Sequence, residues 1–141
     1  MIILDTNLIS EFMNVQPNSN VVRWLSKQRS NHVFITSITL AELRYGVAIL
    51  PEGKRKIHLN EAIEGLIHED FANRILSFDS QATKYYADIG AKRRQLGKPI
   101  SQFDCQIAAI AKSRSAILAT RNIKDFEACD LTLVNPFKYP D

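Results

Sequence analysis

The sequence is poor in the residues that hold many small secreted or zinc-binding proteins together. Among 141 residues there are two cysteines, Cys105 and Cys129. Two are too few for a disulfide framework or a cysteine zinc site, so we expect both to be reduced and packed in the interior. The three histidines, His32, His58 and His68, include no pair three or four residues apart. This spacing excludes the two-histidine helix of zinc proteases.

Long hydrophobic runs are also absent. Runs such as 107–111 are far shorter than the ~20 apolar residues that a membrane helix requires. The first residues, Met-Ile-Ile-Leu-Asp, contain no basic segment and reach a carboxylate at Asp5, which is not the pattern of a signal peptide. We therefore expect a cytoplasmic protein without a membrane span.

Several catalytic motifs are missing. No G-x-S-x-G elbow, G-x-x-x-x-G-K-[ST] loop or G-x-G-x-x-G turn occurs, which argues against a serine hydrolase, a P-loop NTPase and a dinucleotide enzyme. A strand followed by Asp5 is also found in haloacid-dehalogenase phosphatases. These need a second aspartate two residues later, where this chain has Asn7.

What is present is an ordinary globular composition, with 45% hydrophobic and 23% charged residues. Five prolines and five glycines are scattered along the chain, and we find no repeat or linker, so residues 1–141 are predicted to form a single domain. Eighteen Lys and Arg against fifteen Asp and Glu give a net charge of +3. This mild excess is typical of a solvated surface and leaves a nucleic-acid partner open.

Short apolar runs alternate with segments of helical pattern. The predicted strands are 2–4, 33–35, 74–77, 117–119 and 131–134. A helix N-cap is expected at Asp5, and further helices are predicted over about 19–28, 37–50, 55–69, 80–96 and 102–114. This alternation predicts an α/β sandwich with a mainly parallel sheet, whose ligand site lies at the carboxyl ends of the strands.

Five polar residues are candidates for that site. Asp5 follows the first strand, and Asn122 and Asp125 follow the strand at 117–119, whereas Glu42 and Asp104 lie on mostly apolar helices. Each acid also has a structural interpretation. Asp5 fits a helix cap, and the spacings Thr39-x-x-Glu42 and Ser101-x-x-Asp104 fit the capping box, in which the acid bonds a free backbone N–H.

Taken together, these acids favour a second interpretation. Carboxylates that converge at one edge of a sheet repel one another, so their pKa values rise or a cation binds between them. A site made of oxygen ligands without histidine selects a hard ion, Mg²⁺ or Mn²⁺, over zinc. The hypothesis depends on the acids meeting in space, which their spacing along the chain suggests.

Four segments of the chain resemble the motif blocks of PIN-domain ribonucleases, and in particular the VapC toxins and their FitB-like branch. The segments are Ile2–Glu11, Ser37–Gly46, Phe103–Ala109 and Leu118–Phe126, and they occur in the order found in that family. The resemblance extends over nearly the whole chain, to Phe137. It implies a three-layer α/β/α sandwich and a Mg²⁺- or Mn²⁺-dependent endoribonuclease, the toxin of a type II toxin–antitoxin pair.

The resemblance also implies roles for single residues. Asp5, Glu42 and Asp104 match the three acidic positions of the family, with Asp5 and Asp104 as metal ligands and Glu42 as a ligand or a base that orients water. At the fourth position many members have aspartate, whereas this chain has Asn122, followed by Asp125 three residues later. Asparagine offers only a neutral oxygen, which weakens the case for a second tightly held ion.

Several partners are expected. Basic residues are candidates for contact with the RNA backbone, namely Arg93, Arg94, Lys98, Arg121 and Lys124. The resemblance implies a homodimer and a VapB- or FitA-like antitoxin whose tail covers the active site and which makes any contact with DNA. The alternative function is a non-catalytic PIN-like module that binds RNA or a protein partner, an interpretation that Asn122 keeps open.

Overall fold

A computed structural model describes residues 1–140. Its centre is a five-stranded sheet in the order β3-β2-β1-β4-β5, in which every neighbouring pair of strands is parallel. The strands are β1 (Ile2–Leu4), β2 (Val33–Thr36), β3 (Ile75–Leu76), β4 (Ile117–Ala119) and β5 (Thr132–Val134). The predicted parallel sheet is therefore confirmed, although β3 is shorter than the predicted strand at 74–77.

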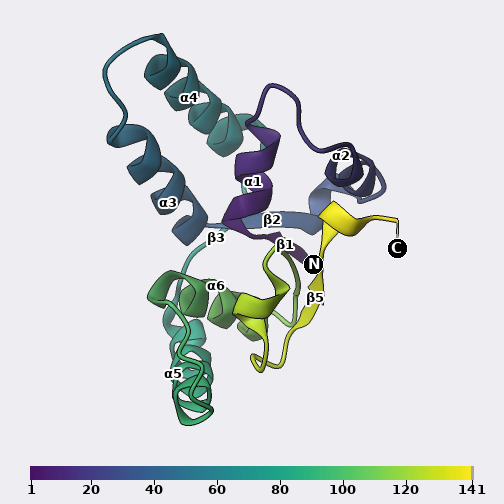
Figure 1. Ribbon diagram of the computed structural model, residues 1–141, viewed down its shortest axis with the longest axis vertical. Helices are drawn as coiled ribbons and strands as arrows, with labels where there is room; N and C mark the ends of the chain where they lie inside the picture. The colour runs from purple at the N-terminus through teal and green to yellow at the C-terminus, as the bar shows by residue number, and fades with distance from the viewer. Residues whose placement is uncertain (141) are drawn as a thin grey trace.

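Helices cover both faces of the sheet (Figure 1). On one side lie α1 (Thr6–Phe12), α2 (Ser19–Ser26), α3 (Ser37–Ala48) and α4 (Lys54–Gly65), and on the other lie α5 (Ser80–Gln95) and α6 (Gln102–Ser113). Short helical turns complete the chain, namely η1 (Ser30–His32), η2 (Leu66–Asp70), η3 (Ile123–Phe126) and η4 (Pro136–Lys138). This arrangement is the three-layer α/β/α sandwich implied by the resemblance.

The strands supply side chains alternately to two hydrophobic cores. In β1, Ile3 packs in the core beneath α5 and α6, whereas Leu4 packs in the core beneath α1 to α4. In β4, Leu118 and Ala119 divide in the same way. Successive side chains of a strand point to opposite faces, so a fully apolar strand indicates a sheet that is covered on both sides.

The helix boundaries differ slightly from those predicted. The segment predicted as one helix over 55–69 divides into α4 and a π-helical turn, η2, which begins at Leu66. The helices α2 and α3 end about two residues earlier than predicted. Cys105 and Cys129 are both buried and not joined in a disulfide, as expected. Within residues 1–140, no helix is long and apolar enough to cross a membrane.

The strand order decides where a ligand site forms. From β1 the chain builds outward through β2 to β3, whereas β4 and β5 lie on the other side of β1. The direction of winding therefore reverses between β1 and β4. In open parallel sheets such a switch point opens a crevice at the carboxyl ends of its two strands. Here those ends lead directly into Asp5 and Thr120.

Candidate active site

Asp5 lies at the carboxyl end of β1 and is 5% exposed. Its backbone N–H donates to the carbonyl of Ala119 in β4, 2.9 Å away. One carboxylate oxygen caps α1 by accepting from the N–H of Thr6 at 2.9 Å. The other accepts from the Thr120 hydroxyl at 2.8 Å and from the Asn7 amide at 3.0 Å. The cap predicted for Asp5 is confirmed, and the same carboxylate faces the crevice.

Glu42 approaches Asp5 from α3. Its Oε1 accepts a hydrogen bond from the Thr6 hydroxyl at 2.8 Å, so α1 and α3 hold it jointly. The capping box predicted for Thr39 and Glu42 is wrong. Thr36 caps α3 by accepting from the N–H of Thr39, which places Glu42 in the second turn, beyond the reach of the helix start. Its carboxylate is thereby left to the crevice.

Asp104 lies in the first turn of α6, whose N-cap is Ser101. The Ser101 hydroxyl accepts from the backbone N–H of Asp104 at 3.2 Å. The positive end of the helix dipole favours a carboxylate at this position. The half of the capping box in which Ser101 caps the helix is confirmed, and Asp104 is half-buried beside the same cleft.

The three acids line one open cleft of about 800 Å³, together with Asn122 and Asp125. All five residues predicted as the site therefore lie around the same space. The acids are not tightly clustered: within residues 1–140, no three His, Cys, Asp or Glu side chains lie close enough to enclose a metal ion. No histidine or cysteine lines the cleft, so its side chains offer only oxygen atoms as ligands for a metal ion. This donor set fits Mg²⁺ or Mn²⁺.

The electrostatics of the cleft disfavour negative charge. Burial raises the pKa of Asp5 from 3.8 to about 6, against the opposing hydrogen bonds from Thr120 and Thr6. The charges of Asp104 and Glu42 raise it further. Burial also raises the pKa values of Glu42 and Asp104, and the charge of Asp104 adds to the shift at Glu42. A bound divalent cation would relieve both the burial cost and the repulsion.

The turn after β4 carries Asn122 and Asp125, the candidates for the fourth acidic position of the family motif. Asn122 precedes the short helix η3, which carries Asp125, and both residues are exposed at the rim of the cleft. The backbone N–H of Asn122 donates to the Thr120 hydroxyl at 3.0 Å, which in turn donates to Asp5. The Asp125 charge raises the pKa of Asp104, which agrees with their closeness.

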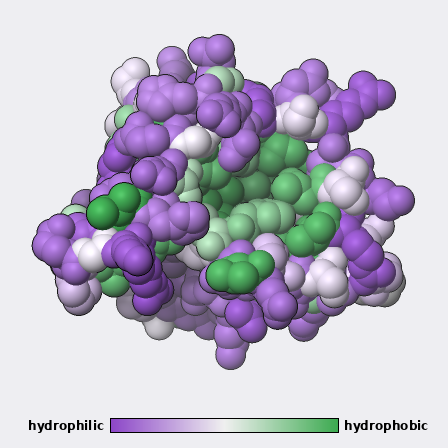
Figure 2. Space-filling view, turned by 90° about the horizontal axis from the view of Figure 1, so that it is seen from above, coloured by the Kyte–Doolittle hydropathy of each residue, from purple (hydrophilic) through white to green (hydrophobic). Residues whose placement is uncertain are grey.

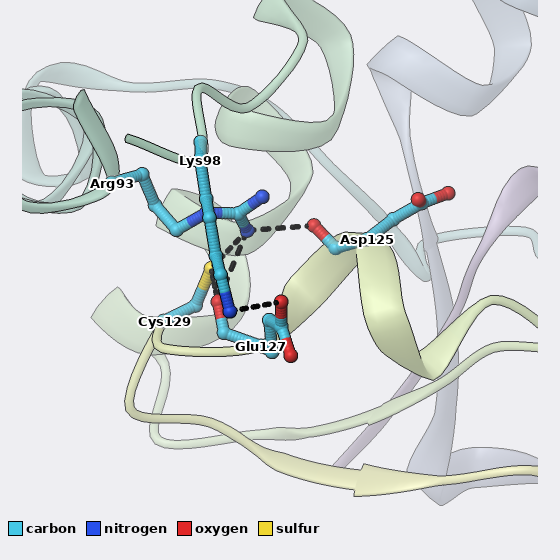
Figure 3. A network of polar contacts seen from close by, with 5 residues as sticks. All are labelled: Arg93, Lys98, Asp125, Glu127 and Cys129. Atoms are coloured by element: carbon cyan, nitrogen blue, oxygen red, sulfur yellow. Dashed lines mark hydrogen bonds and ion pairs between the residues drawn. The ribbon is translucent and has the colours of Figure 1, made fainter. Parts of the chain in front are cut away.

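Arg93 does not lie on the surface as predicted. It is 5% exposed, and its guanidinium donates to three backbone carbonyls, those of Lys98 at 2.6 Å, Asp125 at 2.8 Å and Glu127 at 3.0 Å. Figure 3 shows this network, which also reaches the sulfur of Cys129. The prediction that Arg93 contacts RNA is therefore corrected, because its donors are bound inside the protein. It instead fixes the turn that carries Asp125.

The other predicted RNA contacts occupy different surroundings. Lys98 is exposed but forms an ion pair with Glu127 at 3.1 Å. Arg94 is exposed on α5 and does not line the cleft. Arg121 lines the cleft itself, and Lys124 lines a groove that adjoins it.

Three residues of the site were missed by the sequence analysis. Asn7 and Thr120 orient Asp5, and the Asn7 side chain also accepts from the backbone N–H of Arg121 at 3.2 Å. Phe103 is half-exposed and lines the cleft beside Asp104. The first two stand next to predicted residues at strand ends, and that adjacency is a usable signal. Phe103 carries no signal, because an aromatic residue in a helix normally packs in the core.

Comparison with known proteins agrees with this geometry. The pattern of the PIN domain family matches residues 2–130. The chain is 39% identical to VapC ribonuclease Y4jK of Sinorhizobium fredii over 138 residues, 98% of this chain and 99% of that protein. It is 45% identical to toxin FitB of Neisseria gonorrhoeae over 137 residues, 97% of this chain and 99% of that protein.

A solved structure has the same fold at full length. The structure of FitAB bound to an IR36 DNA fragment contains a chain that superposes with a TM-score of 0.90 at 44% identity, covering 97% of this chain and 96% of that one. The strand-end acids, the parallel sheet and the sequence similarity lead to one assignment. This chain belongs to the PIN domain family.

Proposed function

We propose that this protein is a divalent-cation-dependent endoribonuclease that acts as the toxin of a type II toxin–antitoxin module. The observation that carries the proposal is the convergence of Asp5, Glu42 and Asp104 on one cleft at the switch point of the sheet. The similarity to proteins named VapC ribonuclease and toxin FitB supports the substrate class and the biological role.

In this proposal the acids would hold Mg²⁺ or Mn²⁺. Asp5 and Asp104 would be direct ligands, and Asn122 and Asp125 would be outer ones. Such a cation stabilises the negative charge that builds on phosphoryl oxygens during hydrolysis and makes an attacking water more acidic. Hydrolysis of this kind leaves a 5′-phosphate and a 3′-hydroxyl.

Glu42 is the residue we assign as a further ligand or as the base that orients the attacking water. The Thr6 hydroxyl donates to its Oε1 at 2.8 Å, and the residue lines the cleft. Burial raises the pKa of Glu42, so its carboxylate binds a proton more readily than an exposed glutamate does. A base is most effective when its pKa lies near the working pH, so this environment suits proton transfer.

We further propose that an antitoxin covers an apolar groove on the side of the molecule that carries α1 to α4. Figure 2 shows hydrophobic residues around a hollow on that side. A groove of about 610 Å³ is lined there by Phe12, Val22, Leu25, Leu66 and Phe71, among others. Exposed apolar surface of this kind marks interaction sites. The FitAB complex supports an antitoxin as the occupant.

The remaining expectations follow from the same proposal. The protein would form a homodimer in the cytoplasm, and it would contact DNA only through its antitoxin. Light scattering on the purified protein tests the dimer directly.

The central test is cleavage of single-stranded RNA by protein freed of antitoxin. We expect cleavage with Mg²⁺ or Mn²⁺ and none in EDTA. Asp5→Ala and Asp104→Ala are expected to fall below about 1% of the wild-type rate, because a catalytic cation supplies several kcal/mol of transition-state stabilisation. Asp130→Asn is the matched control, since Asp130 is fully exposed and paired with Lys112 outside the cleft.

Thermal unfolding locates the ion independently of activity. Mn²⁺ is expected to raise the melting temperature of the wild type, and Asp104→Asn is expected to reduce this rise. An equal rise in both proteins would place the ion elsewhere. Undiminished cutting by correctly folded Asp5→Ala would remove the metal mechanism. Binding of Mn²⁺ and RNA without any cleavage would favour the non-catalytic alternative.

A further inference from the structure

A second groove adjoins the acid cleft. It measures about 500 Å³, lies between η3 and η4, and shares Arg121, Asn122 and Asp125 with the cleft. The two spaces therefore lie next to each other, with these three residues between them. A polymer held with one bond at the acids would extend into this groove.

The groove is strongly cationic. Arg121, Lys124 and Lys138 line it, and Asp125 is its single carboxylate. Within residues 1–140, none of the three cations is within 4 Å of an acid, whereas Lys98 nearby is neutralised by Glu127. Positive charge is thus concentrated directly beside the acids, an arrangement that suits a polyanion.

The walls of the groove are held in place. The guanidinium carbon of Arg121 lies 4.7 Å from the centre of the Phe137 ring. The Asn135 side chain accepts from the N–H of Phe137 at 3.0 Å and donates to the carbonyl of Arg121 at 3.4 Å. The Asn20 amide donates to the carbonyl of Phe137 at 2.8 Å. Because these contacts already order the groove, a ligand spends little binding energy on ordering it.

We propose that this groove binds backbone phosphates of the RNA nucleotides next to the scissile bond. Lys124 and Lys138 contact the phosphates, and Arg121 bridges the groove and the cleft. The proposal rests on the ribonuclease function and adds the path of the substrate. Phosphate contacts carry no sequence information. The groove therefore sets the affinity for RNA and its salt dependence, and leaves sequence preference to other residues.

Binding of a fluorescein-labelled single-stranded RNA in EDTA, followed by anisotropy, tests the proposal without cleavage. We expect Lys124→Gln/Lys138→Gln to raise the Kd at least about tenfold at low salt. The slope of log K against log salt should fall by about 1.4, since each phosphate contact on a single strand contributes about 0.7. The loss should be equal for RNAs of different sequence.

The control is Lys54→Gln/Lys84→Gln, which removes the same charge from exposed positions on α4 and α5. An equal loss of RNA affinity in both double variants would refute the role of the groove, because the change in net charge would then explain the effect. So would unchanged RNA binding by Lys124→Gln/Lys138→Gln together with weaker antitoxin binding, which would make the groove a protein-binding surface. If the wild type cleaves RNA and Lys124→Gln/Lys138→Gln binds RNA normally, the proposal that the groove binds RNA is refuted and the ribonuclease function stands. A wild type that neither binds nor cleaves RNA refutes both.

Discussion

Single residues in this site serve folding and chemistry together. Asp5 caps α1 and also lines the cleft, so the structural interpretation of its position is confirmed and the same carboxylate remains the candidate metal ligand. Its hydroxyl and amide partners, Thr120 and Asn7, hold the carboxylate in one orientation. Burial nevertheless outweighs these bonds and raises its pKa to about 6. The residue is thus built at a cost to stability that a cation would offset.

This cost predicts how stability depends on pH. The pKa of Asp5 rises from 3.8 in the unfolded chain to about 6 in the native protein, so the native state binds more protons between these values. The free energy of unfolding in EDTA should therefore fall as pH increases from about 4 to about 7, by at most about 3 kcal/mol from this residue. Asp5→Asn should shrink that decline, as measured by urea unfolding across this range.

The matched control is Asp130→Asn. The hydrogen bond and ion pair with Lys112 lower the pKa of Asp130, and Asp130 is fully exposed. Its substitution should therefore leave the decline of the free energy of unfolding with pH unchanged. An Asp5→Asn profile as steep as that of the wild type would contradict the assignment of the decline to Asp5.

At the scale of elements, the site depends on how helices and turns are joined. The Thr6 hydroxyl connects α1 to Glu42 of α3. Arg93 of α5 connects to η3 and to the chain after it through the carbonyls of Asp125 and Glu127. These bonds connect segments that are distant in sequence. They decide where the acids stand relative to one another.

Removing the hydrogen bonds of the Arg93 guanidinium should destabilise the protein. Arg93→Met would remove three hydrogen bonds from a buried guanidinium to the carbonyls of Lys98, Asp125 and Glu127, and a hydrogen bond to a charged group contributes about 1.5–3 kcal/mol. We expect the free energy of unfolding to fall by at least about 3 kcal/mol in urea titrations, with partial recovery in Arg93→Lys.

Lys112→Met provides the comparison, because Lys112 pairs with Asp130 at 2.7 Å near the same loop but at the surface. Exposed pairs contribute about 0–1 kcal/mol, so this variant should remain close to the wild type. Equal losses in Arg93→Met and Lys112→Met would show that burial of the guanidinium is unimportant.

The whole molecule presents surfaces of distinct chemistry. The acid cleft opens at the carboxyl ends of β1 and β4 and adjoins the cationic groove by η4, whereas an apolar groove lies on the side of α1 to α4. Hydrolysis of RNA would use the first two surfaces. Binding of an antitoxin would use the third, with its tail expected over the acid cleft. Substitutions in the apolar groove can therefore weaken antitoxin binding without changing the residues of the acid cleft.

Substitution in the apolar groove should therefore release the antitoxin. Val22 lines this groove and is 42% exposed, so Val22→Asp should change the free energy of unfolding by about 0.5 kcal/mol or less. We expect affinity for the proposed antitoxin to fall about 30-fold, as for the loss of an interface hot spot. Leu96→Asp, at an exposed apolar residue directly after α5, should bind normally. Equal binding by both variants would exclude the groove.

The sequence alone determined the class of fold and the candidate acids. Apolar runs such as 2–4 and 117–119 are short and lack alternation because both faces of the sheet are covered, and that pattern is local. Asp5, Asn122 and Asp125 could be found because residues that follow parallel strands gather at one edge. The family resemblance rested on the same segments.

Only the tertiary structure decided which groups meet and which are buried. Glu42 fits a capping box along the chain, yet its carboxylate accepts instead from the hydroxyl of Thr6, 36 residues away. Arg93 and Arg94 are neighbours in a basic run, but only Arg93 is buried, with its guanidinium bonded to the backbone carbonyls of Asp125 and Glu127. The local sequence pattern indicates which face of a helix or strand a residue lies on. The distant backbone atoms that it contacts there depend on how the helices pack against the sheet.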